Sequence, residues 1–370
     1  MVDTPALGAG AERRGGSSPF CRTQESPVAG LFVVGGSHTI TGSKTINNNI
    51  SLMDLSVKIG NLVLPSPIVA ASCSLTIIPR NCLAYEKAGA GAIIMKSIFQ
   101  EEIIAENDSY EYFSPWLEQD YLDKYCDMIR EIKKVCTIPV IASVSCVNAE
   151  GWPAYARNLQ QAGADALELN VMTLESAPDY DYGEMERNHV EILKAVKDVV
   201  DIPVIIKVGN CLTNAVRLSA SLYEAGAAAV VLFNKMCPVD INVEDVCYKM
   251  GKVMTGSTEI YNVMRWAALS AAGVPELPVM ASGGVCDGES LIKVLLSGAT
   301  VGQVCSPLYT QGESAIGEMH EYLISWMESH GYSSPSEFIG LLNAASHEGA
   351  ARFERIQFVK NISKAKSLKI

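Results

Sequence analysis

The sequence predicts a (β/α)8 barrel, a closed sheet of eight parallel strands with helices between them. Two short patterns alternate along the chain after residue 53: a proline before a β-branched or apolar run, and a Gly-Ala pair that opens an apolar run. Each proline lies about twenty residues before the next Gly-Ala pair, which leaves room for a strand, a helix and a turn. Four such pairs therefore predict four βαβ units.

The predicted strands follow these patterns in chain order. Prolines open the odd-numbered strands and glycines the even-numbered ones, at Pro67, Gly91, Pro139, Gly163, Pro203, Gly226, Pro278 and Gly298. The runs are short and almost entirely apolar, as expected for parallel strands that are buried on both faces. The segments between them repeat apolar residues at helical spacing, for example at Trp152, Tyr155, Leu159 and Ala162.

A doubly wound open sheet is the competing architecture. It normally has a glycine-rich fingerprint after its first strand, and residues 70–74 read Ala-Ala-Ser-Cys-Ser. The barrel is therefore favoured. Two apolar stretches flank Gly60 between Val57 and Leu64, and we expect them to form a hairpin that closes the floor of the barrel.

We divide the chain into a disordered extension (1–52), a barrel (53–332) and a helical tail (333–370). The first segment is rich in Gly, Ser, Thr and Asn and lacks the apolar residues of a core. Its arginines are compatible with a transit peptide, but its acidic residues argue against one. They favour the simpler interpretation that the sequence starts at an upstream start codon and that Met53 is the natural start.

Composition favours a small-molecule partner. The 370 residues are 48% apolar and 19% charged, which suits a large folded core. The 41 acidic against 29 basic residues argue against a nucleic-acid binder. The 11 cysteines form no metal-ligand pair and are typical of reduced, buried thiols in a cytoplasmic protein. No apolar run approaches the roughly 18 to 20 residues of a membrane span.

Polar residues gather where the predicted strands end, which is where barrels carry their chemistry. They are Ser72, Cys73, Lys96, Ser97, Ser145, Asn148, Asn170, Lys207, Asn234, Ser282, Gly283, Gly284, Cys305 and Ser306. Lys96 and Lys207 each end an apolar run, where an ammonium group needs an anionic partner. A bound anion is the natural one, and the alternative is a pair of structural lysines that reach the rim.

The sequence predicts a phosphate site built from backbone amides at the ends of the last two strands. Gly283 and Gly284 end the seventh strand, and Cys305 and Ser306 follow the eighth. A mere turn is the alternative. Asp287 is expected to cap the following helix. None of the five histidines lies at a strand end, which argues against a histidine-ligated metal. The nearby carboxylates that could act as acid or base are Glu168, Glu175, Asp179 and Asp181.

These strand-end motifs resemble the dihydroorotate dehydrogenase family of FMN-dependent barrels over roughly residues 55–327, and most closely its uncharacterised dihydroorotate dehydrogenase-like members. The stretches that carry the resemblance are Ala70-Ala71-Ser72, Met95-Lys96-Ser97, Leu167-Glu168-Leu169-Asn170, Ile206-Lys207, Phe233-Asn234, Ser282-Gly283-Gly284-Val285 and the run 298–304. The segment 351–358 also looks like the ending of that subgroup.

The resemblance implies a bound FMN. Gly283, Gly284, Cys305 and Ser306 would hold its phosphate. Lys207 would place positive charge beside the flavin ring, and Lys96 would serve flavin or substrate. The ring and ribityl chain would be surrounded by Ala71, Ser72, Lys96, Ser97, Asn148, Asn170, Lys207, Asn234 and Ser282.

The substrate motif departs from the family pattern. Where dihydroorotate dehydrogenases carry a Cys or Ser base, this chain has Thr173, and Glu175 replaces an asparagine that binds orotate. An acidic Glu175 would repel that carboxylate. The resemblance therefore implies hydride transfer between flavin and a C–C or C=C bond of another small substrate. Glu175 is favoured over Thr173 as the proton-transfer group, and Cys146 is a weaker candidate.

Three rival functions stay open. The first is a genuine dihydroorotate dehydrogenase of pyrimidine biosynthesis. The second is a Schiff-base aldolase that uses Lys96 or Lys207. The third is a flavin-binding electron-transfer subunit without catalysis of its own. The resemblance also allows a homodimer, and neither the electron acceptor nor a partner subunit is identified.

Overall fold

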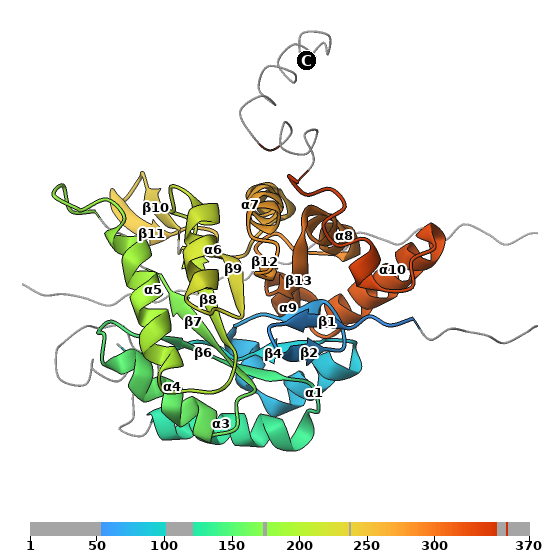
Figure 1. Cartoon of the computed structure of the whole chain (residues 1–370), viewed down its shortest axis with the longest axis horizontal. Coiled ribbons are helices and arrows are strands. Elements are labelled where there is room, and N and C mark those ends of the chain that lie inside the picture. Colours follow the sequence, from blue (N-terminus) through green and yellow to red (C-terminus); the bar gives the residue numbers. More distant parts are fainter. Residues whose placement is uncertain (1–52, 101–120, 173–175, 237, 346–352, 354–370) are drawn as a thin grey trace, which may run out of the picture. The chain divides into compact units, whose positions relative to one another are not determined.

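The computed structural model describes residues 53–100, 121–172, 176–236, 238–345 and 353. The described residues form a (β/α)8 barrel, as predicted (Figure 1). Its elements are, in chain order, β1 (Val57–Ile59), β2 (Leu62–Leu64), β3 (Ile68–Ala70), η1 (Ser74–Ile77), α1 (Pro79–Lys87), β4 (Ala92–Ile94), β5 (Ile98–Phe99), α3 (Tyr121–Val135), β6 (Val140–Ser145), α4 (Gly151–Gln161), β7 (Ala166–Val171), α5 (Glu184–Lys197), β8 (Val204–Gly209), α6 (Ala215–Glu224), β9 (Ala229–Asn234), β10 (Val239–Asn242), β11 (Cys247–Met250), η2 (Ser257–Glu259), α7 (Ile260–Gly273), β12 (Val279–Ser282), α8 (Gly288–Ser297), β13 (Ala299–Val304), α9 (Ser306–Gln311), α10 (Ser314–His330) and η3 (Pro335–Glu337).

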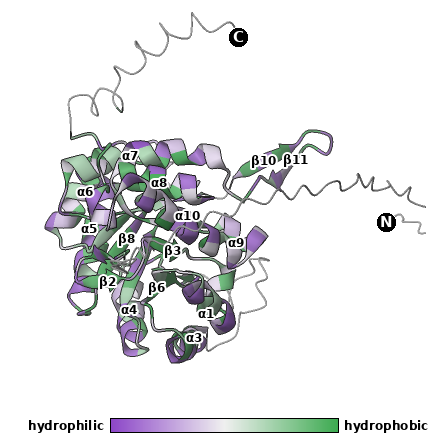
Figure 2. Ribbon diagram, turned by 90° about the vertical axis from the view of Figure 1, so that its right-hand side faces the viewer, coloured by the Kyte–Doolittle hydropathy of each residue, from purple (hydrophilic) through white to green (hydrophobic). Residues whose placement is uncertain are grey.

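All eight predicted barrel strands are present and parallel. They pair in the order β3, β4, β6, β7, β8, β9, β12 and β13, and the pairing of β13 with β3 closes the ring. The short strand β5 adds to β6 beyond the end of β4. Figure 2 shows apolar strands inside a ring of helices that present hydrophilic residues outward. The proline and glycine patterns thus mark real strand starts.

The floor of the barrel is closed by the predicted hairpin. Strands β1 and β2 pair antiparallel around Gly60 and Asn61. Their buried residues Val57, Ile59 and Leu64 belong to one apolar cluster with the inward-facing residues Val69, Ala92, Ile94, Ile141, Ala166, Ile205, Ala229, Val231, Met280 and Val301. This cluster fills the lower barrel, so the lumen can open only at the carboxyl ends of the strands.

A second apolar cluster lies between the strands and the surrounding helices. The predicted helix cap is also present, since Asp287 has extended backbone and its carboxylate accepts from the Ser290 amide at 2.8 Å. After α10 the chain packs back on the barrel, with Phe338 fully buried. No helix in the described ranges is long and apolar enough to cross a membrane.

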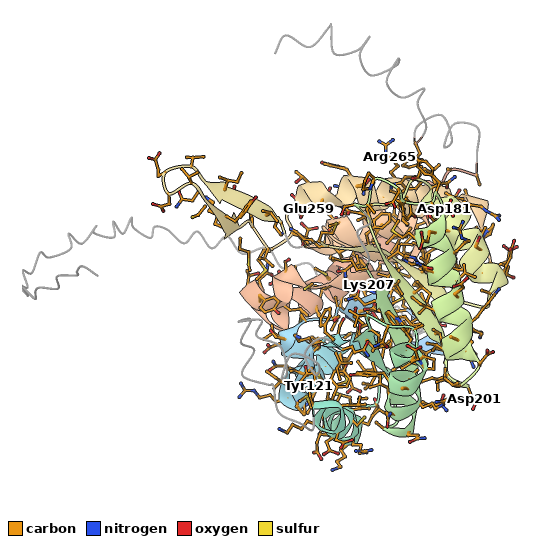
Figure 3. All side chains as sticks on the ribbon, turned by 90° about the vertical axis from the view of Figure 1, so that its left-hand side faces the viewer. Tyr121, Asp181, Asp201, Lys207, Glu259 and Arg265 are labelled. Atoms are coloured by element: carbon orange, nitrogen blue, oxygen red, sulfur yellow. The ribbon has the colours of Figure 1, made fainter. Side chains whose placement is uncertain are left out.

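A second hairpin, β10–β11, extends from the carboxyl end of the barrel (Figures 2 and 3). Its register places Val239 opposite Met250 and Ile241 opposite Tyr248, so these four side chains share one face. All four are exposed, by 56% or more. The sequence patterns did not predict this element.

Candidate active site

A layer of polar side chains lies directly above the apolar floor of the barrel. Side chains two residues apart on a strand share a face, so the inward face continues from Ile141, Ala166, Ile205 and Val301 to Ser143, Glu168, Lys207 and Gln303. These four polar side chains are almost fully buried, with exposures of 0%, 0%, 6% and 2%. The strand alternation thus sets a polar network on an apolar base.

Glu168 is the centre of this network. Its carboxylate accepts hydrogen bonds from Ser143 Oγ at 3.0 Å and from Gln303 Nε2 at 3.3 Å. The Lys207 ammonium group lies 3.5 Å from the same carboxylate, and Figure 3 places Lys207 in the interior of the barrel. A buried carboxylate needs such partners, because an unpaired charge away from water is very costly.

The anionic partner predicted for Lys207 is therefore found, in part, within the protein. The sequence pattern indicated a bound anion, whereas Glu168 supplies a carboxylate from the neighbouring strand β7. The prediction missed this pair because adjacent strands bring together residues that are far apart in sequence. The ammonium group has three donors, and the long contact to Glu168 occupies one of them. Lys207 also lines a cavity.

A second branch of the network joins four of the predicted flavin-site residues. Ser97 Oγ lies 2.8 Å from Ser143 Oγ and 3.3 Å from Ser72 Oγ. The amide of Asn170 donates to Ser97 Oγ at 3.5 Å, and Asn234 Nδ2 donates to Asn170 Oδ1 at 2.6 Å. The ends of β3, β4, β7 and β9 are thus connected by side-chain hydrogen bonds.

The network borders a cavity of about 240 Å³ at the mouth of the barrel. This volume is close to the lower end of small-molecule sites, which span roughly 300 to 1,000 Å³. Nine of the predicted residues line it: Ala71, Ser72, Lys207, Asn234, Ser282, Gly283, Gly284, Cys305 and Ser306. Gln303 lines it as well. Most of the predicted flavin site therefore converges on one cavity.

The two glycines predicted to bind a phosphate have a backbone conformation that lets a ligand approach the main chain closely. Gly283 and Gly284 have φ angles of +108° and +76°, which side chains rarely adopt. A Cβ atom on Gly284 would lie 2.4 Å from the Ile260 amide nitrogen. Ser306 Oγ accepts from the Thr255 amide at 2.9 Å and thereby fixes the loop before η2 against α9.

An unsatisfied buried atom supports a polar ligand in this cavity. The side-chain oxygen of Gln303 is one of three buried side-chain atoms in the described residues without a hydrogen-bond partner, beside His189 Nε2 and Ser270 Oγ. Buried polar atoms are almost always paired, so such an exception calls for a ligand or water. Because Gln303 lines the cavity beside Lys207, the residues present fit a polar, anionic cofactor.

Four predicted flavin-site residues do not line this cavity. Ser97 and Asn170 belong to the adjoining hydrogen-bond network, whereas Lys96 and Asn148 lie apart from it. Lys96 places its ammonium group 5.5 Å from the centre of the Phe99 ring, and its carbonyl accepts from Tyr125 Oη at 2.8 Å. Asn148 is exposed and its side-chain oxygen accepts from the Gly151 amide at 2.9 Å, at the start of α4. It lines a separate cavity of about 500 Å³ together with Cys146, Trp152 and Met172.

The carboxylate candidates divide into three groups. Glu168 is fully buried within the network. Asp179 and Asp181 are exposed in the loop before α5, where Asp181 pairs with Arg187. Thr173 and Glu175, the two candidates for proton transfer, lie outside the described residues, as does the extension 1–52.

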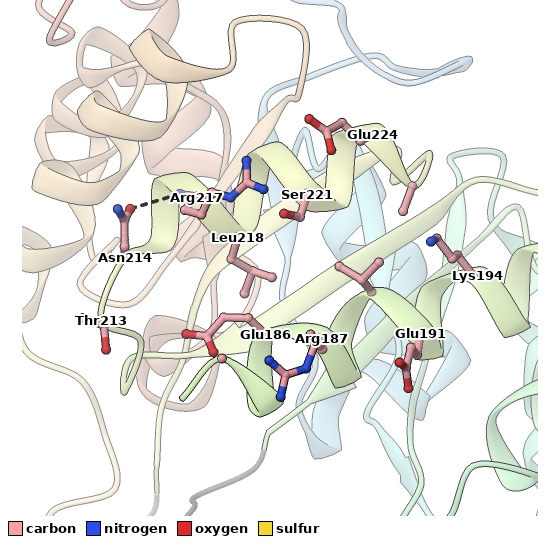
Figure 4. Close-up of a pocket in the computed structure, with 13 residues that line it drawn as sticks. Glu186, Arg187, Glu191, Lys194, Thr213, Asn214, Arg217, Leu218, Ser221 and Glu224 are labelled. Carbon is pink, nitrogen blue, oxygen red and sulfur yellow. Dashed lines mark hydrogen bonds between the residues drawn. The ribbon is translucent and has the colours of Figure 1, made fainter. Parts of the chain in front are cut away.

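Another cavity, of about 600 Å³, lies on the outer helices instead of the mouth. Figure 4 shows it between α5 and α6, lined by side chains such as Glu186, Arg187, Lys194 and Arg217. None of the predicted site residues lines it. Its alternating surface charges are typical of neighbouring solvated helices.

Sequence reasoning missed Ser143, Gln303 and Tyr125. Ser143 links the two branches of the network through its contacts with Ser97 and Glu168, and Gln303 donates to Glu168. Tyr125 Oη lies 3.3 Å from the Ser143 carbonyl oxygen and amide nitrogen. A signal was present for the first two, because each is a polar residue inside a buried apolar run. Tyr125 comes from helix α3 and carried no such signal.

The comparisons with known proteins agree with this geometry. Residues 117–327 match the family model for dihydroorotate dehydrogenase. The catalytic subunit of dihydroorotate dehydrogenase B (NAD(+)) from Pyrococcus furiosus is 24% identical over 316 residues, which cover 78% of this chain and 99% of the relative. The subunit of the same name from Pyrococcus abyssi is 26% identical over 302 residues, covering 78% and 98%. The family match spans more than half of the chain, and the chain therefore belongs to the dihydroorotate dehydrogenase family of oxidoreductases.

Proposed function

We propose that the protein is an FMN-dependent oxidoreductase that acts on a C–C or C=C bond of a small substrate. The observation that carries this is the cavity at the barrel mouth, which is lined by Lys207, by Gln303 with its unsatisfied oxygen, and by Gly283 and Gly284. When bound, the flavin would supply hydride transfer. Membership of the family supports the same activity.

Different residues of this site would bind different parts of the cofactor. Gly283, Gly284, Cys305 and Ser306 would bind its phosphate through backbone amides and the Ser306 hydroxyl. Lys207 would place its free donors toward the ring, while Glu168 fixes the ammonium group from behind. Ser72, Ser97, Asn170 and Asn234 would be preorientated by the hydrogen bonds they share. This places the polar groups before the cofactor binds, which lowers the cost of ordering them.

Glu175 is the proposed proton-transfer group, with Thr173 as its alternative. Both follow Asn170 by a few residues, just beyond the carboxyl end of β7. A carboxylate is the better base, since an unaided hydroxyl holds its proton at neutral pH. The same carboxylate makes dihydroorotate a poor substrate, because its own carboxylate would be repelled.

An absorption spectrum followed by anaerobic titration with dihydroorotate tests this function. We expect oxidised-flavin bands in the purified protein, and we expect dihydroorotate to leave them unbleached. Bleaching would instead make the protein a genuine dihydroorotate dehydrogenase, as its relatives are named. A colourless protein that takes up no added FMN would refute the flavin site and favour Schiff-base chemistry at the lysines, which borohydride trapping would detect.

Two variants separate the cofactor site from the substrate site. Lys207→Met should weaken FMN binding about tenfold, equal to about 1.4 kcal/mol, measured by flavin fluorescence. The exposed Lys293→Met is its matched control, with unchanged binding expected. Glu175→Asn should leave FMN binding unchanged and strengthen orotate binding, seen as a shift of the flavin spectrum. Unchanged orotate binding in Glu175→Asn would remove Glu175 from the substrate pocket.

We also propose that the protein forms a homodimer through the β10–β11 hairpin. Its apolar face of Val239, Ile241, Tyr248 and Met250 is exposed in the described chain. Acidic Glu244 and Asp245 lie at the tip, and basic Lys252 follows the base. A two-fold pair that sets tip against base would match these charges and cover both apolar faces.

Light scattering during gel filtration tests the dimer. The wild type should elute as a dimer, and Ile241→Ser with Tyr248→Ser should elute as a monomer with an unchanged circular dichroism spectrum. A monomeric wild type, or a dimer that survives both substitutions, would contradict this interface.

A further inference from the structure

In the described part of the chain, the side-chain groups that contact the Glu168 carboxylate are all hydrogen-bond donors. They are Ser143 Oγ at 3.0 Å, Gln303 Nε2 at 3.3 Å and the Lys207 ammonium group at 3.5 Å. The ammonium group and the amide nitrogen have no lone pair to offer, and the nearby positive charge favours an ionised carboxylate. An ionised carboxylate can only accept hydrogen bonds. Glu168 therefore accepts from all three neighbours.

This charge sets the direction of a chain of three serine hydroxyls. Each hydroxyl has one proton to donate and two lone pairs that accept. Because Ser143 donates its proton to Glu168, Ser97 must be the donor in the 2.8 Å contact between Ser97 Oγ and Ser143 Oγ. Ser97 then has no second proton, so Ser72 donates across the 3.3 Å contact between Ser72 Oγ and Ser97 Oγ. Every hydroxyl proton in the chain thus points toward Glu168.

Two amide side chains follow the same order. Asn170 Nδ2 lies 3.5 Å from Ser97 Oγ and donates to it. A reversed Asn170 amide would place its oxygen against a hydroxyl whose proton already goes to Ser143. Asn234 Nδ2 then donates to Asn170 Oδ1 at 2.6 Å. The directions of the hydrogen bonds are therefore consistent from Glu168 to the end of β9.

The serine chain ends at the cavity with a lone pair. Ser72 Oγ accepts from the Ser97 backbone amide at 2.9 Å and donates its own proton to Ser97 Oγ. These are the bonds of Ser72 Oγ within the described residues, and they leave one of its two lone pairs available. Ser72 lines the cavity. A group that binds Ser72 from the cavity must therefore be a donor.

A second acceptor at the cavity has the same cause. Because Glu168 only accepts, the Gln303 amide turns its nitrogen toward Glu168, and its oxygen is left without a partner. Gln303 is 2% exposed and lines the cavity. Its strand β13 pairs with β3, and Ser72 follows the end of β3. The two acceptor oxygens thus come from adjacent strands.

We propose that Glu168 is a positioning residue that makes Ser72 and Gln303 hydrogen-bond acceptors toward the cavity, so that the site selects a ligand with N–H or O–H groups at these two positions. A ligand that met these oxygens with acceptor atoms would leave buried polar atoms unpaired, and this disfavours its binding. Lys207 lines the same cavity and donates. The site therefore distinguishes donors from acceptors in a ligand.

The choice of FMN as this ligand rests on the proposed function, whereas the direction of the hydrogen bonds does not. FMN carries donors at ring N3 and at the hydroxyls of its ribityl chain. These are the groups that we expect to meet Ser72 and Gln303.

Neutron diffraction from crystals of the full chain in heavy water tests the direction, because it locates deuterium atoms. We expect the deuterium of Ser72 to point toward Ser97, that of Ser97 toward Ser143, and that of Ser143 toward an ionised Glu168. A deuterium atom on the Glu168 carboxyl group, or one on Ser72 Oγ that points into the cavity, would overturn the inference. This measurement needs no variant and no bound flavin.

Analogues of FMN that each lack one donor test the selection. The probes are 3-methyl-FMN and FMN without single ribityl hydroxyls, and flavin fluorescence gives their dissociation constants. We expect one probe for each acceptor to bind the wild type about tenfold more weakly than FMN. That difference should vanish in Ser72→Ala for one probe and in Gln303→Leu for the other. It should persist in Ser74→Ala, the matched control, whose exposed hydroxyl contacts Tyr309 Oη.

Ser143→Ala tests the role of Glu168 while both acceptors and Lys207 stay in place. It interrupts the chain between Glu168 and Ser97, so the Ser72 proton can turn into the cavity. We expect the difference between FMN and the probe that depends on Ser72 to shrink from about tenfold to about twofold. Ser219→Ala is the matched control, since this buried hydroxyl donates to the Ala215 carbonyl within α6, and it should discriminate like the wild type.

The outcomes separate this inference from the proposed function. Equal affinity of the wild type for FMN and every probe would overturn the selection. Undiminished discrimination in Ser143→Ala would show that Glu168 does not set it. If the wild type binds no FMN, the proposed function fails, while the neutron map still decides the direction of the hydrogen bonds.

Discussion

Lys207 Nζ lies 3.5 Å from Glu168 Oε1 in the interior of the barrel, and both side chains are almost fully excluded from water. The pair stands between an apolar floor and a polar cavity, so it is both part of the core and part of the site. Ser143 and Gln303 complete the shell of the carboxylate. Glu168, which does not line the cavity itself, therefore helps to set the charge that Lys207 presents to a ligand there.

Removing one member of this pair should destabilise the fold. Glu168→Gln leaves the Lys207 ammonium group buried without its counter-charge, and we expect the free energy of unfolding of the cofactor-free protein to fall by about 3 kcal/mol. Urea unfolding measures this loss. The double variant Glu168→Gln with Lys207→Met removes both charges and should recover much of the stability. An unchanged midpoint in Glu168→Gln would mean that the pair is solvated after all.

The two glycines at the cavity should respond differently to alanine. Gly284→Ala combines a φ of +76° with a Cβ atom only 2.4 Å from the Ile260 amide, so α7 must shift. Gly283→Ala has a φ of +108° but an ordinary 3.5 Å contact to Val263. Positive φ costs roughly 1 to 2 kcal/mol, so we expect Gly283→Ala to lose about that much and Gly284→Ala clearly more in thermal unfolding. Equal losses of stability in the two variants would mean that the start of α7 can move away from the added Cβ atom at no cost in free energy.

The cap of α8 offers a smaller, well-defined test. The Asp287 carboxylate accepts from the Ser290 amide, and Asp287→Ala leaves that amide without its partner. We expect a loss of about 1 kcal/mol of stability. Asp287→Asn should keep most of it, because the amide oxygen can accept the same bond. Equal losses in both variants would show that charge, instead of the cap, is what stabilises the helix.

The strands were predictable because parallel barrel strands are apolar on both faces, and the prolines and glycines that bound them stand out in the sequence. The network was predictable only in part. Lys207 was expected at the mouth, but its pairing with Glu168 depends on strand register, which one sequence does not state. Ser143 and Gln303 are single polar residues within apolar runs. This signal is weaker than that of the polar residues that follow the strand ends, so the two residues were not selected. Asn148 was grouped with the others by its position after β6, yet it lines a different cavity with Trp152.

The hairpin β10–β11 was missed for a different reason. Its strands are four residues each and mostly exposed. Short exposed strands lack the continuous apolar run that marked the barrel strands, and the insertion follows β9 where a helix was expected. The alternation of Val239 and Ile241 with polar neighbours was the available signal.

His189 predicts a pH dependence of stability. It is 1% exposed on α5, and its ring nitrogen Nδ1 lies 2.6 Å from the Met185 carbonyl oxygen. Burial lowers the pKa of His189 below its ordinary value, so the folded state keeps the ring neutral. The unfolded state takes up a proton below about pH 6.5, and it therefore binds more protons than the folded state. Stability must fall as the pH decreases through this range, by at most about 1.4 kcal/mol per pH unit.

Urea midpoints at pH 7.5 and pH 5.5 measure this effect, with His189→Gln as the comparison. Burial also lowers the pKa of His320, which is only partly buried, and its contribution is common to both proteins. The difference between wild type and variant therefore isolates His189. We expect the wild type to lose about 1 kcal/mol more than His189→Gln on acidification. If the two proteins lose the same stability, the His189 ring takes up a proton without penalty in the folded state, and its burial in α5 does not control its charge.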